Sequence, residues 1–578
     1  MTHNPRGFHA GPEQHLNRSA ALTALPSEIF DVLVIGGGVT GLGVAVDSAS
    51  RGLLTALVER HDFSSGTSSK SSKLIHGGLR YLQQGDVRLV YEALHERRRL
   101  CSNAPHLVRV LPFMIPIVTK DGLIKKKIAR ALGSALWMYD LTGGWRIGKL
   151  HRRLRAKAAY KHFPTMPEGK LASAYLYYDA AADDSRICLA LAETAASLGA
   201  VVTNRCSVVS VSPNKNGVNT EDGITTVGLL TAEGESISVR AKVVVNATGV
   251  WADDVRQLDE GRHPSTIRPA KGVHITIPWE KVRNDIAVVI PVPKDKRSLF
   301  VVPWVEKSDG TFMYTYIGTT DTDYQGPVDN PQCTKDDIDY VLRAINASVT
   351  TNITTDDVLA VWAGLRPLVK PAENESISNR TADLSRRHSV TTSAHGVITV
   401  TGGKLTTYRE MAEDTVDLAV EQLGLAASKY KCRTKHLRFV GADNYREPKA
   451  GDVAARHLAH RFGTRSKVVI DMIAKQPELA LPLVPGLPYL RAEAVYAVQY
   501  EMATTLDDIL SRRTRSLLFD RGATRRAARD VASLVAPYLT WSAEEIERQV
   551  AEFDKVCAEE ERAGAVPESE FLGAHKDS

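Results

Sequence analysis

Residues 31–59 read DVLVIGGGVTGLGVAVDSASRGLLTALVE and predict a unit that binds a dinucleotide. The apolar, β-branched run before the glycines is typical of a buried parallel strand. Gly36, Gly38 and Gly41 follow it as G-x-G-x-x-G, and residues 42–50 continue with the apolar periodicity of a helix. Such glycines allow a tight turn and bring a pyrophosphate close to the amino end of the helix, where free N–H groups and a partial positive charge attract phosphate.

Glu59 closes the second strand of this unit. Residues 54–59, LTALVE, form a short apolar run, and Glu59 lies 18 residues after Gly41. A carboxylate at about this distance accepts hydrogen bonds from the hydroxyls of the adenosine ribose. A bare G-x-G-x-x-G also occurs as a turn that only packs a helix, but two strands and an acid in register favour the nucleotide. The unit by itself does not distinguish NAD from FAD.

Two later strand-to-helix turns are expected to contact the same nucleotide. Residues 241–249, AKVVVNATG, and residues 397–403, VITVTGG, each read as an apolar strand that ends at glycine. One nucleotide served by separated turns implies a discontinuous domain and favours flavin, because a helix amino terminus beside the flavin pyrimidine stabilises charge on the reduced ring. A second complete fingerprint, expected if NADPH also bound, is missing. The predicted cofactor contacts here are Thr248, Gly249, Trp251, Gly402, Gly403, Lys404, Leu405 and Thr406.

The bulk composition is that of an ordinary globular protein. With 578 residues the chain is expected to form two or three domains, and 43% hydrophobic with 24% charged residues argues against a disordered chain. A net charge of +6 does not indicate a nucleic-acid partner. The six scattered cysteines form no CxxC pair, so we expect no metal site and a reducing, cytoplasmic compartment. No run of 18 apolar residues occurs, so any membrane contact is expected to be peripheral.

Several longer motifs resemble those of one family. They are GGGVTG at 36–41, SSKLIHGGLRYL at 71–82, GTTDTDY at 318–324, AGLRPL at 363–368 and TGGKLTTYR at 401–409. Over roughly residues 30–540 the chain resembles the bacterial FAD-dependent glycerol-3-phosphate dehydrogenases, which are aerobic and quinone-linked. A run as long as SSKLIHGGLRYL is far more specific than a lone glycine fingerprint.

The resemblance implies an α/β plus α+β fold. We expect a discontinuous Rossmann-like FAD domain of the glutathione-reductase or D-amino-acid-oxidase type, an antiparallel-sheet cap and a helical C-terminal domain. The expected bounds are a flexible tail at 1–29, the FAD domain at 30–263 and 359–431 with inserted helices around 105–170, the cap at 264–358 and the helical domain at 432–578. The cap strands are expected at 274–278, 287–291, 298–304 and 312–320. Apolar residues recur at helical spacing from Val495 to Ile509, and Ser542 with Glu545 predicts the start of a last helix.

The reaction implied is oxidation of sn-glycerol 3-phosphate at C2 to dihydroxyacetone phosphate, with the hydride passed to FAD and the electrons to a membrane quinone, ubiquinone or menaquinone. A phosphate dianion is best held by arginine, whose planar fork binds two oxygens. Each such arginine can also be interpreted as a surface ion-pair residue, and Asp321 as a turn-forming aspartate. The substrate contacts implied are Arg80, Tyr81, Thr320, Asp321, Arg366 and Arg380.

The hydroxyl proton at C2 needs an acceptor, and a neutral imidazole is the usual one. His274, in KGVHITIP, matches a position at the family's substrate pocket and is the leading base, while arginine-assisted proton transfer stays open. Lys404 is expected to face the flavin N1 and O2 side or the substrate phosphate, and Arg366 and Lys404 complete the predicted catalytic set. The SSKLIHGG segment is expected to lie against the flavin through Ser71, Ser72, His76 and Gly77.

Residues 124–139, IKKKIARALGSALWMY, form a candidate membrane face. An apolar stripe beside lysines and arginine is typical of an interfacial helix on anionic lipid, and the basic segment 151–157 extends it. A helix packed on its own protein shows the same periodicity.

Three alternative functions stand beside this one. An oxidase that passes electrons to O2 would share the substrate motifs. An amine or amino-acid oxidoreductase would share the flavin fold, but the substrate-side arginines and SSKLIHGGLRYL weigh against it. A non-catalytic FAD-binding protein would leave His274, Arg80 and Arg366 without a role. The sequence does not give the oligomeric state, and a homodimer is compatible with it.

Overall fold

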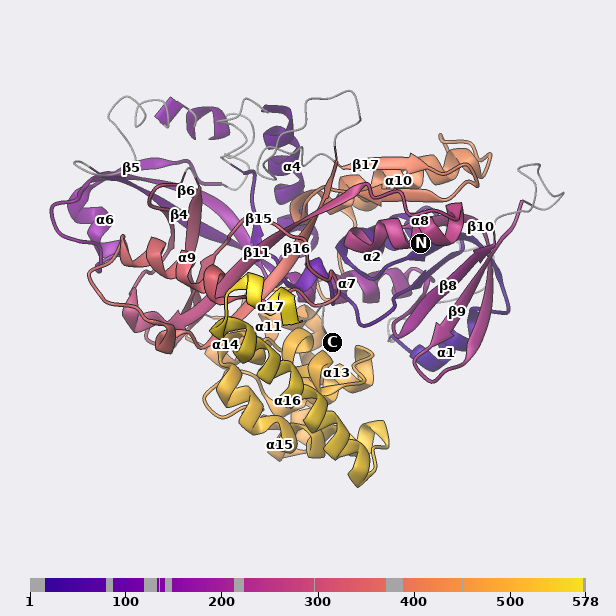
Figure 1. Cartoon of the computed structure of the whole chain (residues 1–578). Helices are drawn as coiled ribbons and strands as arrows, with labels where there is room; N and C mark the ends of the chain where they lie inside the picture. The colour runs from indigo at the N-terminus through magenta and orange to yellow at the C-terminus, as the bar shows by residue number, and fades with distance from the viewer. Residues whose placement is uncertain are drawn as a thin grey trace.

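The structure is a computed structural model that describes residues 16–78, 87–118, 133, 134, 136–140, 148–212, 223–295, 297–370, 388–449 and 451–574. Figure 1 shows the two sheets side by side with the C-terminal helices packed beneath them. We call the eight-stranded sheet the dinucleotide sheet and the ten-stranded sheet the cap sheet. Helices outside the C-terminal region include α1 (Arg18–Ala24), α2 (Val39–Ser50), α4 (Val87–Asn103), α6 (Ala156–His162), α7 (Asp184–Ser197), α8 (Ala252–Glu260), α9 (Lys335–Asn346) and α10 (Tyr408–Gln422).

The dinucleotide sheet has the predicted strand, glycine turn, helix and strand at its centre. Its main path runs β17-β18-β10-β1-β2-β7, and β1 pairs in parallel with both β2 and β10. The strands are β1 (Ile29–Ile35), β2 (Thr55–Val58), β7 (Val201–Thr203), β8 (Cys206–Ser212), β9 (Thr225–Thr231), β10 (Ser236–Asn246), β17 (Ser389–Thr392) and β18 (Ile398–Thr401). The strands before all three predicted cofactor turns therefore lie next to one another, which confirms the Rossmann-like prediction.

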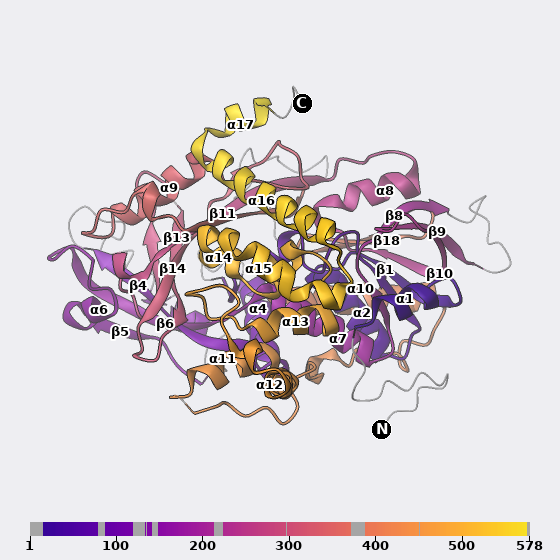
Figure 2. The same ribbon diagram turned by 90° about the horizontal axis from the view of Figure 1, so that it is seen from below.

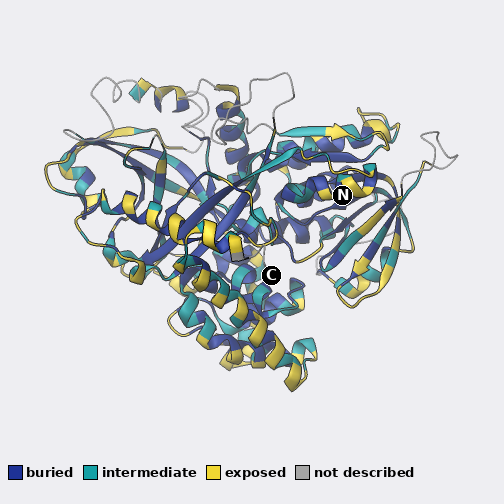
Figure 3. Ribbon diagram, in the orientation of Figure 1, coloured by how far each residue is buried: buried dark blue, intermediate teal, exposed yellow. Residues whose placement is uncertain are grey.

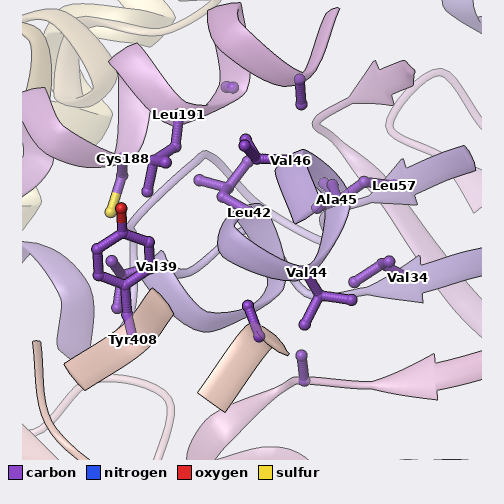
Figure 4. Close-up of a cluster of buried hydrophobic side chains, with 14 of the residues drawn as sticks. Val34, Val39, Leu42, Val44, Ala45, Val46, Leu57, Cys188, Leu191 and Tyr408 are labelled. Carbon is purple, nitrogen blue, oxygen red and sulfur yellow. The ribbon is translucent and has the colours of Figure 1, made fainter. Parts of the chain in front are cut away.

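Helix α2 is buried on nearly all sides, because its small and β-branched residues fit between the sheet and two other helices. Figure 4 shows Leu42 and Val46 of α2 beside Leu191 of α7, with Tyr408 of α10 close by. Gly43 permits this packing, since a methyl group there would lie 2.7 Å from the Tyr408 ring. The amino end of α2 is thereby fixed at the glycine turn.

The cap sheet confirms the four predicted strands, which form β11 to β14 and pair in antiparallel fashion in the order β11-β14-β13-β12. Its strands are β3 (Leu74–Ile75), β4 (Val108–Val118), β5 (Arg152–Arg155), β6 (Leu171–Ala182), β11 (Ile267–Pro278), β12 (Ala287–Pro291), β13 (Ser298–Glu306), β14 (Phe312–Gly318), β15 (Thr322–Asp323) and β16 (Ala360–Val369).

The cap sheet is larger than the predicted cap range. Strands β4 and β6, which pair along almost their whole length, come from the region around 105–170 and its C-terminal flank, where inserted helices were predicted. In that region α6 is a helix, but the alternating and apolar side chains of β4 fit a sheet instead. Strand β16, assigned by sequence to the FAD domain, pairs with β11 over ten residue pairs. Pairing between segments far apart in the chain leaves no local pattern, which is why the sequence did not predict it.

Part of the predicted N-terminal tail is packed, and residues 1–15 lie outside the described part. Helix α1 begins after Asn17, whose side chain accepts a hydrogen bond from the amide of Ala20. Arg18 bonds Glu233 at 2.8 Å, and Leu25 is fully buried. The prediction of a loose tail up to residue 29 is therefore wrong from residue 16 onward.

The C-terminal region is helical, as predicted. Figure 2 shows its two longest helices, α15 and α16, side by side, and Figure 3 shows exposed residues along their outer faces. Ser542 caps α16 by accepting from the Glu545 amide. The predicted stripe from Val495 to Ile509 is not one helix, because α13 ends at Tyr500 and a π-helix begins only at Asp508. The helices are α11 (Val453–Phe462), α12 (Ser466–Lys475), α13 (Arg491–Tyr500), α14 (Ser516–Phe519), α15 (Arg521–Leu539), α16 (Ala543–Ala565) and α17 (Glu568–Ala574).

Buried ion pairs join this helical region to the dinucleotide sheet. Asp62, in the loop after β2, is fully buried and accepts from Nη1 of Arg513 at 2.6 Å, from its Nη2 at 2.8 Å and from Nε of Arg512 at 2.6 Å. A buried charge with several charge-assisted hydrogen bonds is costly to leave unpaired. The C-terminal region therefore fixes the loop that follows Glu59. None of the helices in the described ranges is both long and apolar enough to cross a membrane.

Candidate active site

A cavity of about 240 Å³ opens where the three predicted cofactor turns meet. The glycine turn after β1, the loop after β2, the turn after β10 and the turn after β18 all line it. Pro367 of β16 also lines it, so the cap sheet borders the cavity. The predicted cofactor residues that line the cavity are Gly36, Gly38, Glu59, Thr248, Gly249, Trp251, Gly402, Gly403, Lys404 and Leu405.

The glycines leave no room for side chains in this cradle. Gly36 has a φ of +113° in the left-handed region, and a methyl group there would lie 2.7 Å from the carbonyl oxygen of Ala247. Gly41 does not line the cavity but lies behind it, where a methyl group would come within 2.0 Å of the Gly36 carbonyl oxygen. The first glycine therefore shapes the turn and the third lets the helix approach it.

Glu59 lies at the edge of the cavity with both oxygens bound. Oε2 accepts from the Gly37 amide at 2.6 Å, and Oε1 accepts from the His61 amide at 2.8 Å. Burial raises the pKa of Glu59. Each carboxylate oxygen has a further lone pair, so the predicted hydrogen bonds to ribose hydroxyls fit this arrangement. The sequence reasoning missed Ser68, which accepts from the Val39 amide and lines the same cavity.

The SSKLIHGG segment connects the cofactor turns to the cap sheet. Oγ of Ser71 donates to Asp184 at 2.6 Å, and Oγ of Ser72 lies 2.9 Å from Nε2 of His274. The amide of His76 donates to Oγ1 of Thr406 at 3.2 Å. The amide of Gly77 donates to Tyr139 at 3.0 Å. Direct contact of Ser71, Ser72, His76, Gly77 and Thr406 with FAD stays a prediction, because these side chains and amides bind protein groups and do not line the cavity.

Arg366 is held in a fixed position on β16. Its Nη1 donates to Asp321 at 3.2 Å, and its Nη2 donates to Oγ1 of Thr319 at 3.0 Å and to the carbonyl oxygen of Thr320 at 3.1 Å. Its guanidinium lies over Gly272, where a methyl group would come within 2.5 Å of Nη2. The structure thus brings three predicted substrate residues together, with Asp321 and Thr320 orienting the arginine.

Residues two apart on a strand share a face, so the side chain of His274 projects from the face of β11 on which a Cβ atom of residue 272 would lie. This is the face that Arg366 covers at Gly272. The side chain of His274 is 2% exposed, and its ring stacks on Trp362 with ring centres 4.7 Å apart. Nδ1 is buried without a hydrogen-bond partner among the described residues. Burial, with the positive charges of Lys73 and Arg366, holds the pKa of His274 well below its usual range, so the imidazole is neutral at physiological pH.

Three predicted substrate residues, Arg80, Tyr81 and Arg380, lie outside the described residues. The sequence reasoning also missed Lys73 and Trp362, which contact each other and lie beside His274. Lys73 lies within SSKLIHGG and Trp362 directly precedes AGLRPL, so both motifs drew attention to the right segments. Only the pairing of β11 with β16 places Trp362 opposite His274.

The geometry agrees with comparisons to known proteins. Profiles described as FAD dependent oxidoreductase and C-terminal domain of alpha-glycerophosphate oxidase match residues 31–409 and 432–546. Glycerol-3-phosphate dehydrogenase 2 of Mycobacterium tuberculosis is 40% identical, over 94% of this chain and 90% of that protein. The mitochondrial glycerol-3-phosphate dehydrogenase of Mesocricetus auratus is 38% identical, over 94% and 75%.

Among solved structures, the glycerol-3-phosphate dehydrogenase of Bacillus halodurans complexed with FAD superimposes with a TM-score of 0.72 and 28% identity, covering 93% of this chain and 96% of that one. The glycine cradle, the acid at its edge and the three converging turns fit such a cofactor. FAD is the cofactor of this protein, and the chain belongs to the FAD-dependent oxidoreductases and, within them, to the glycerol-3-phosphate dehydrogenase family.

Proposed function

We propose that this protein oxidises sn-glycerol 3-phosphate at C2 to dihydroxyacetone phosphate. The observation that carries the proposal is the placement of a fixed guanidinium and a buried imidazole on one face of the cap sheet. Arg366 lies over Gly272, and His274 follows two residues later on the same face of β11. Two residues of a strand span about 7 Å, a spacing that suits the hydroxyl and the phosphate of a three-carbon ester. The names of the related proteins support the same substrate.

The proposed roles follow from the chemistry of each group. Arg366 holds the phosphate dianion through its fork, and Asp321 and Thr320 fix the orientation of that fork. His274 accepts the hydroxyl proton as C2 becomes a carbonyl carbon, and Ser72 orients the imidazole. FAD, when bound, supplies the acceptor for the hydride that leaves C2 with both electrons of its bond. Lys404 lines the cofactor cavity, and its positive charge would favour the reduced, negatively charged form of a flavin bound there.

The test is to mix the FAD-loaded protein with sn-glycerol 3-phosphate in the absence of oxygen and follow the absorbance of oxidised flavin. We expect bleaching with this substrate and none with glycerol, which lacks the phosphate. A protein that holds FAD but does not bleach with the phosphate ester would contradict the proposed substrate. A non-catalytic FAD-binding protein would give that result.

We further propose that the electrons pass to a membrane quinone and that the protein docks peripherally on the inner face of the cell membrane. The supporting surface differs from the predicted stripe, of which Ile124, Ile128 and Leu132 lie outside the described residues. Leu136 and Tyr139, the two described members of the stripe, are buried in the protein and pack inward. Trp137 and Met138, which lie between them in the chain, are 56% and 43% exposed.

Exposed residues of the neighbouring segment extend this surface. Leu150 is 52% exposed, and the ring of Trp137 lies 4.9 Å from that of His151. Exposed basic residues follow directly, and aromatic and aliphatic groups beside arginine and lysine are typical of a surface that binds anionic lipid. We call this set the docking patch: Trp137, Met138, Lys149, Leu150, Arg152, Arg153 and Arg155.

Two measurements test the acceptor and the patch. Reoxidation of the reduced enzyme by a soluble quinone is expected to be faster than reoxidation by air, and rapid reoxidation by air with one peroxide per flavin would identify an oxidase instead. Co-sedimentation with vesicles that contain phosphatidylglycerol is expected for the wild type and not for the variant Trp137→Ala with Leu150→Ala. Equal sedimentation of both proteins would contradict docking through this patch. The oligomeric state, which the sequence does not give, is measured in the same preparations by light scattering.

A further inference from the structure

A buried lysine lies behind the proposed base. The side chain of Lys73 is 4% exposed, and its Nζ lies 4.4 Å from the centre of the Trp362 ring. Trp362 in turn stacks on His274, with ring centres 4.7 Å apart and planes 9° apart. Because both distances share the Trp362 ring, the ammonium lies within about 9 Å of the imidazole centre, where unit charges interact appreciably in a partly buried site.

The charge of Lys73 is only weakly neutralised by its surroundings. Its Nζ donates to the carbonyl oxygens of Ser69 at 3.3 Å and Ser71 at 3.5 Å and to Asp184 at 3.5 Å, all long contacts. Asp184 is bound more closely by Arg515 and by the hydroxyl of Ser71. Burial lowers the pKa of Lys73 to about 8, so the side chain is still mostly protonated at neutral pH. Its field therefore extends toward the cap sheet.

The other charge that acts on the imidazole is also positive and belongs to Arg366, which is itself paired with Asp321. On β16, Arg366 adds a second positive charge near His274. On β14, Tyr316 lies with its ring 6.3 Å from His274, and burial raises the pKa of its phenol, which stays neutral. No carboxylate among the described residues is hydrogen-bonded to His274. Near Lys73 the charged groups are Asp183, Asp184 and Arg515.

We propose that Lys73 is a positioning residue for the oxidation step: its buried ammonium, acting across Trp362, keeps the imidazole of His274 unprotonated before the substrate binds, and its side chain holds the Trp362 ring against that imidazole. This inference rests on the proposed function, in which His274 accepts the hydroxyl proton. It assigns Lys73 no contact with the reacting atoms. The cation–π contact and the parallel stack are the geometry that couples the two side chains.

Removing the positive charge of Lys73 is expected to shift the pKa of His274 in one direction. A positive charge near a histidine disfavours imidazolium, so its loss raises the pKa of His274 and leaves less of the neutral base at acidic pH. The acidic limb, which is the fall in rate as the pH decreases and His274 becomes protonated, then moves to higher pH by about one unit. This size follows from the interaction of two unit charges at this separation in a medium of dielectric constant about 20. Below the limb the variant is up to about tenfold slower than the wild type at the same pH, while the alkaline plateau changes little.

The experiment measures the second-order rate constant of flavin bleaching at sn-glycerol 3-phosphate concentrations well below saturation, without oxygen, from about pH 4 to about pH 9, because this constant reports the protonation of the free enzyme. Lys73→Met and Lys73→Gln remove the charge, and the glutamine keeps hydrogen-bond donors for Ser69 and Ser71. Lys73→Arg keeps the charge and serves as the matched control. Ionisation of the substrate phosphate is the same in every protein, so it cancels in the comparison. We expect the limb to move in Lys73→Met and Lys73→Gln and to stay in place in Lys73→Arg.

Several outcomes would overturn the proposal. A limb that stays in place in both uncharged variants, with only a lower plateau, means that Lys73 has a purely structural role. If both uncharged variants lose FAD and Lys73→Arg keeps it, the charge of Lys73 serves the ion pair with Asp184 and the structure around the cofactor, not the imidazole. His274→Gln separates this failure from failure of the proposed function: if that variant keeps the wild-type rate and limb, His274 is not the base and both inferences fall.

Discussion

Gly272→Ala tests whether the proposed phosphate site depends on the position of Arg366. A methyl group at residue 272 would lie 2.5 Å from Nη2 and 2.9 Å from Cζ of Arg366, and 2.7 Å from Oγ1 of Thr319. Ordinary contacts begin near 3.4 Å, so the guanidinium must move by about 1 Å. That movement breaks the hydrogen bonds to Asp321 and Thr319 that fix the fork. A displacement of about 1 Å in a positioning group costs on the order of 100-fold in rate.

The assay is steady-state oxidation of sn-glycerol 3-phosphate with a soluble electron acceptor, with FAD content measured for each protein. We expect kcat/KM of Gly272→Ala to fall by about 100-fold while FAD stays bound, because residue 272 does not line the cofactor cavity. Gly451→Ala is the matched control, since a methyl group at that exposed turn has nothing within 4 Å. In an Arg366→Ala background the same Gly272→Ala change is expected to add little, because the group it displaces is already gone. Near-wild-type kinetics, or full additivity in the double variant, would refute the reasoning.

Three other variants probe the cofactor turn, the domain junction and the phosphate contact. Gly41→Ala is expected to abolish FAD binding, read as flavin absorbance per protein, because the methyl group would lie 2.0 Å from a backbone oxygen. Asp62→Asn is expected to lower the free energy of unfolding in urea by about 3–5 kcal/mol, because the buried guanidinium of Arg513 loses the carboxylate that binds it most closely. Arg366→Ala is expected to raise KM by about 10- to 100-fold, as loss of a charge-assisted contact predicts, whereas Arg268→Ala, which removes a surface pair with Asp323 on the same sheet, leaves KM unchanged.

The sequence predicted well those features whose causes are local. The glycine turn and its flanking strands follow from a short run of residue types, since apolar β-branched runs form buried strands and glycine alone fits the turn at Gly36. The four cap strands are also local alternations between turns. The extent of the cap sheet was not predictable, because β4, β6 and β16 join it through pairing across long stretches of chain.

The difference between local patterns and contacts across long stretches of chain also explains why the residues of the docking patch were not predicted. Helical periodicity in 124–139 predicts that a helix has two faces but does not say which face is covered. The structure buries Leu136 and Tyr139 and exposes Trp137 and Met138, because the first two join a core cluster with strands of the cap sheet. The charge pattern of the segment was therefore readable from the sequence, and its orientation was not.

The SSKLIHGG segment, the most specific stretch of the sequence, has its composition because it connects parts of the site that lie on different elements. Short hydroxyl side chains let the backbone run close to its partners: Ser71 binds Asp184 at the start of α7, and Ser72 binds His274 on β11. Lys73 has a φ of +58°, a strained conformation for a lysine, and its ammonium lies over Trp362. Glycine or asparagine would adopt this backbone conformation with less strain, so the lysine is expected to supply a property that they lack. At this position that property is its positive charge. The position of the charge, one aromatic ring away from the proposed base, is the reason to measure the pH profile of the Lys73 variants rather than their stability alone.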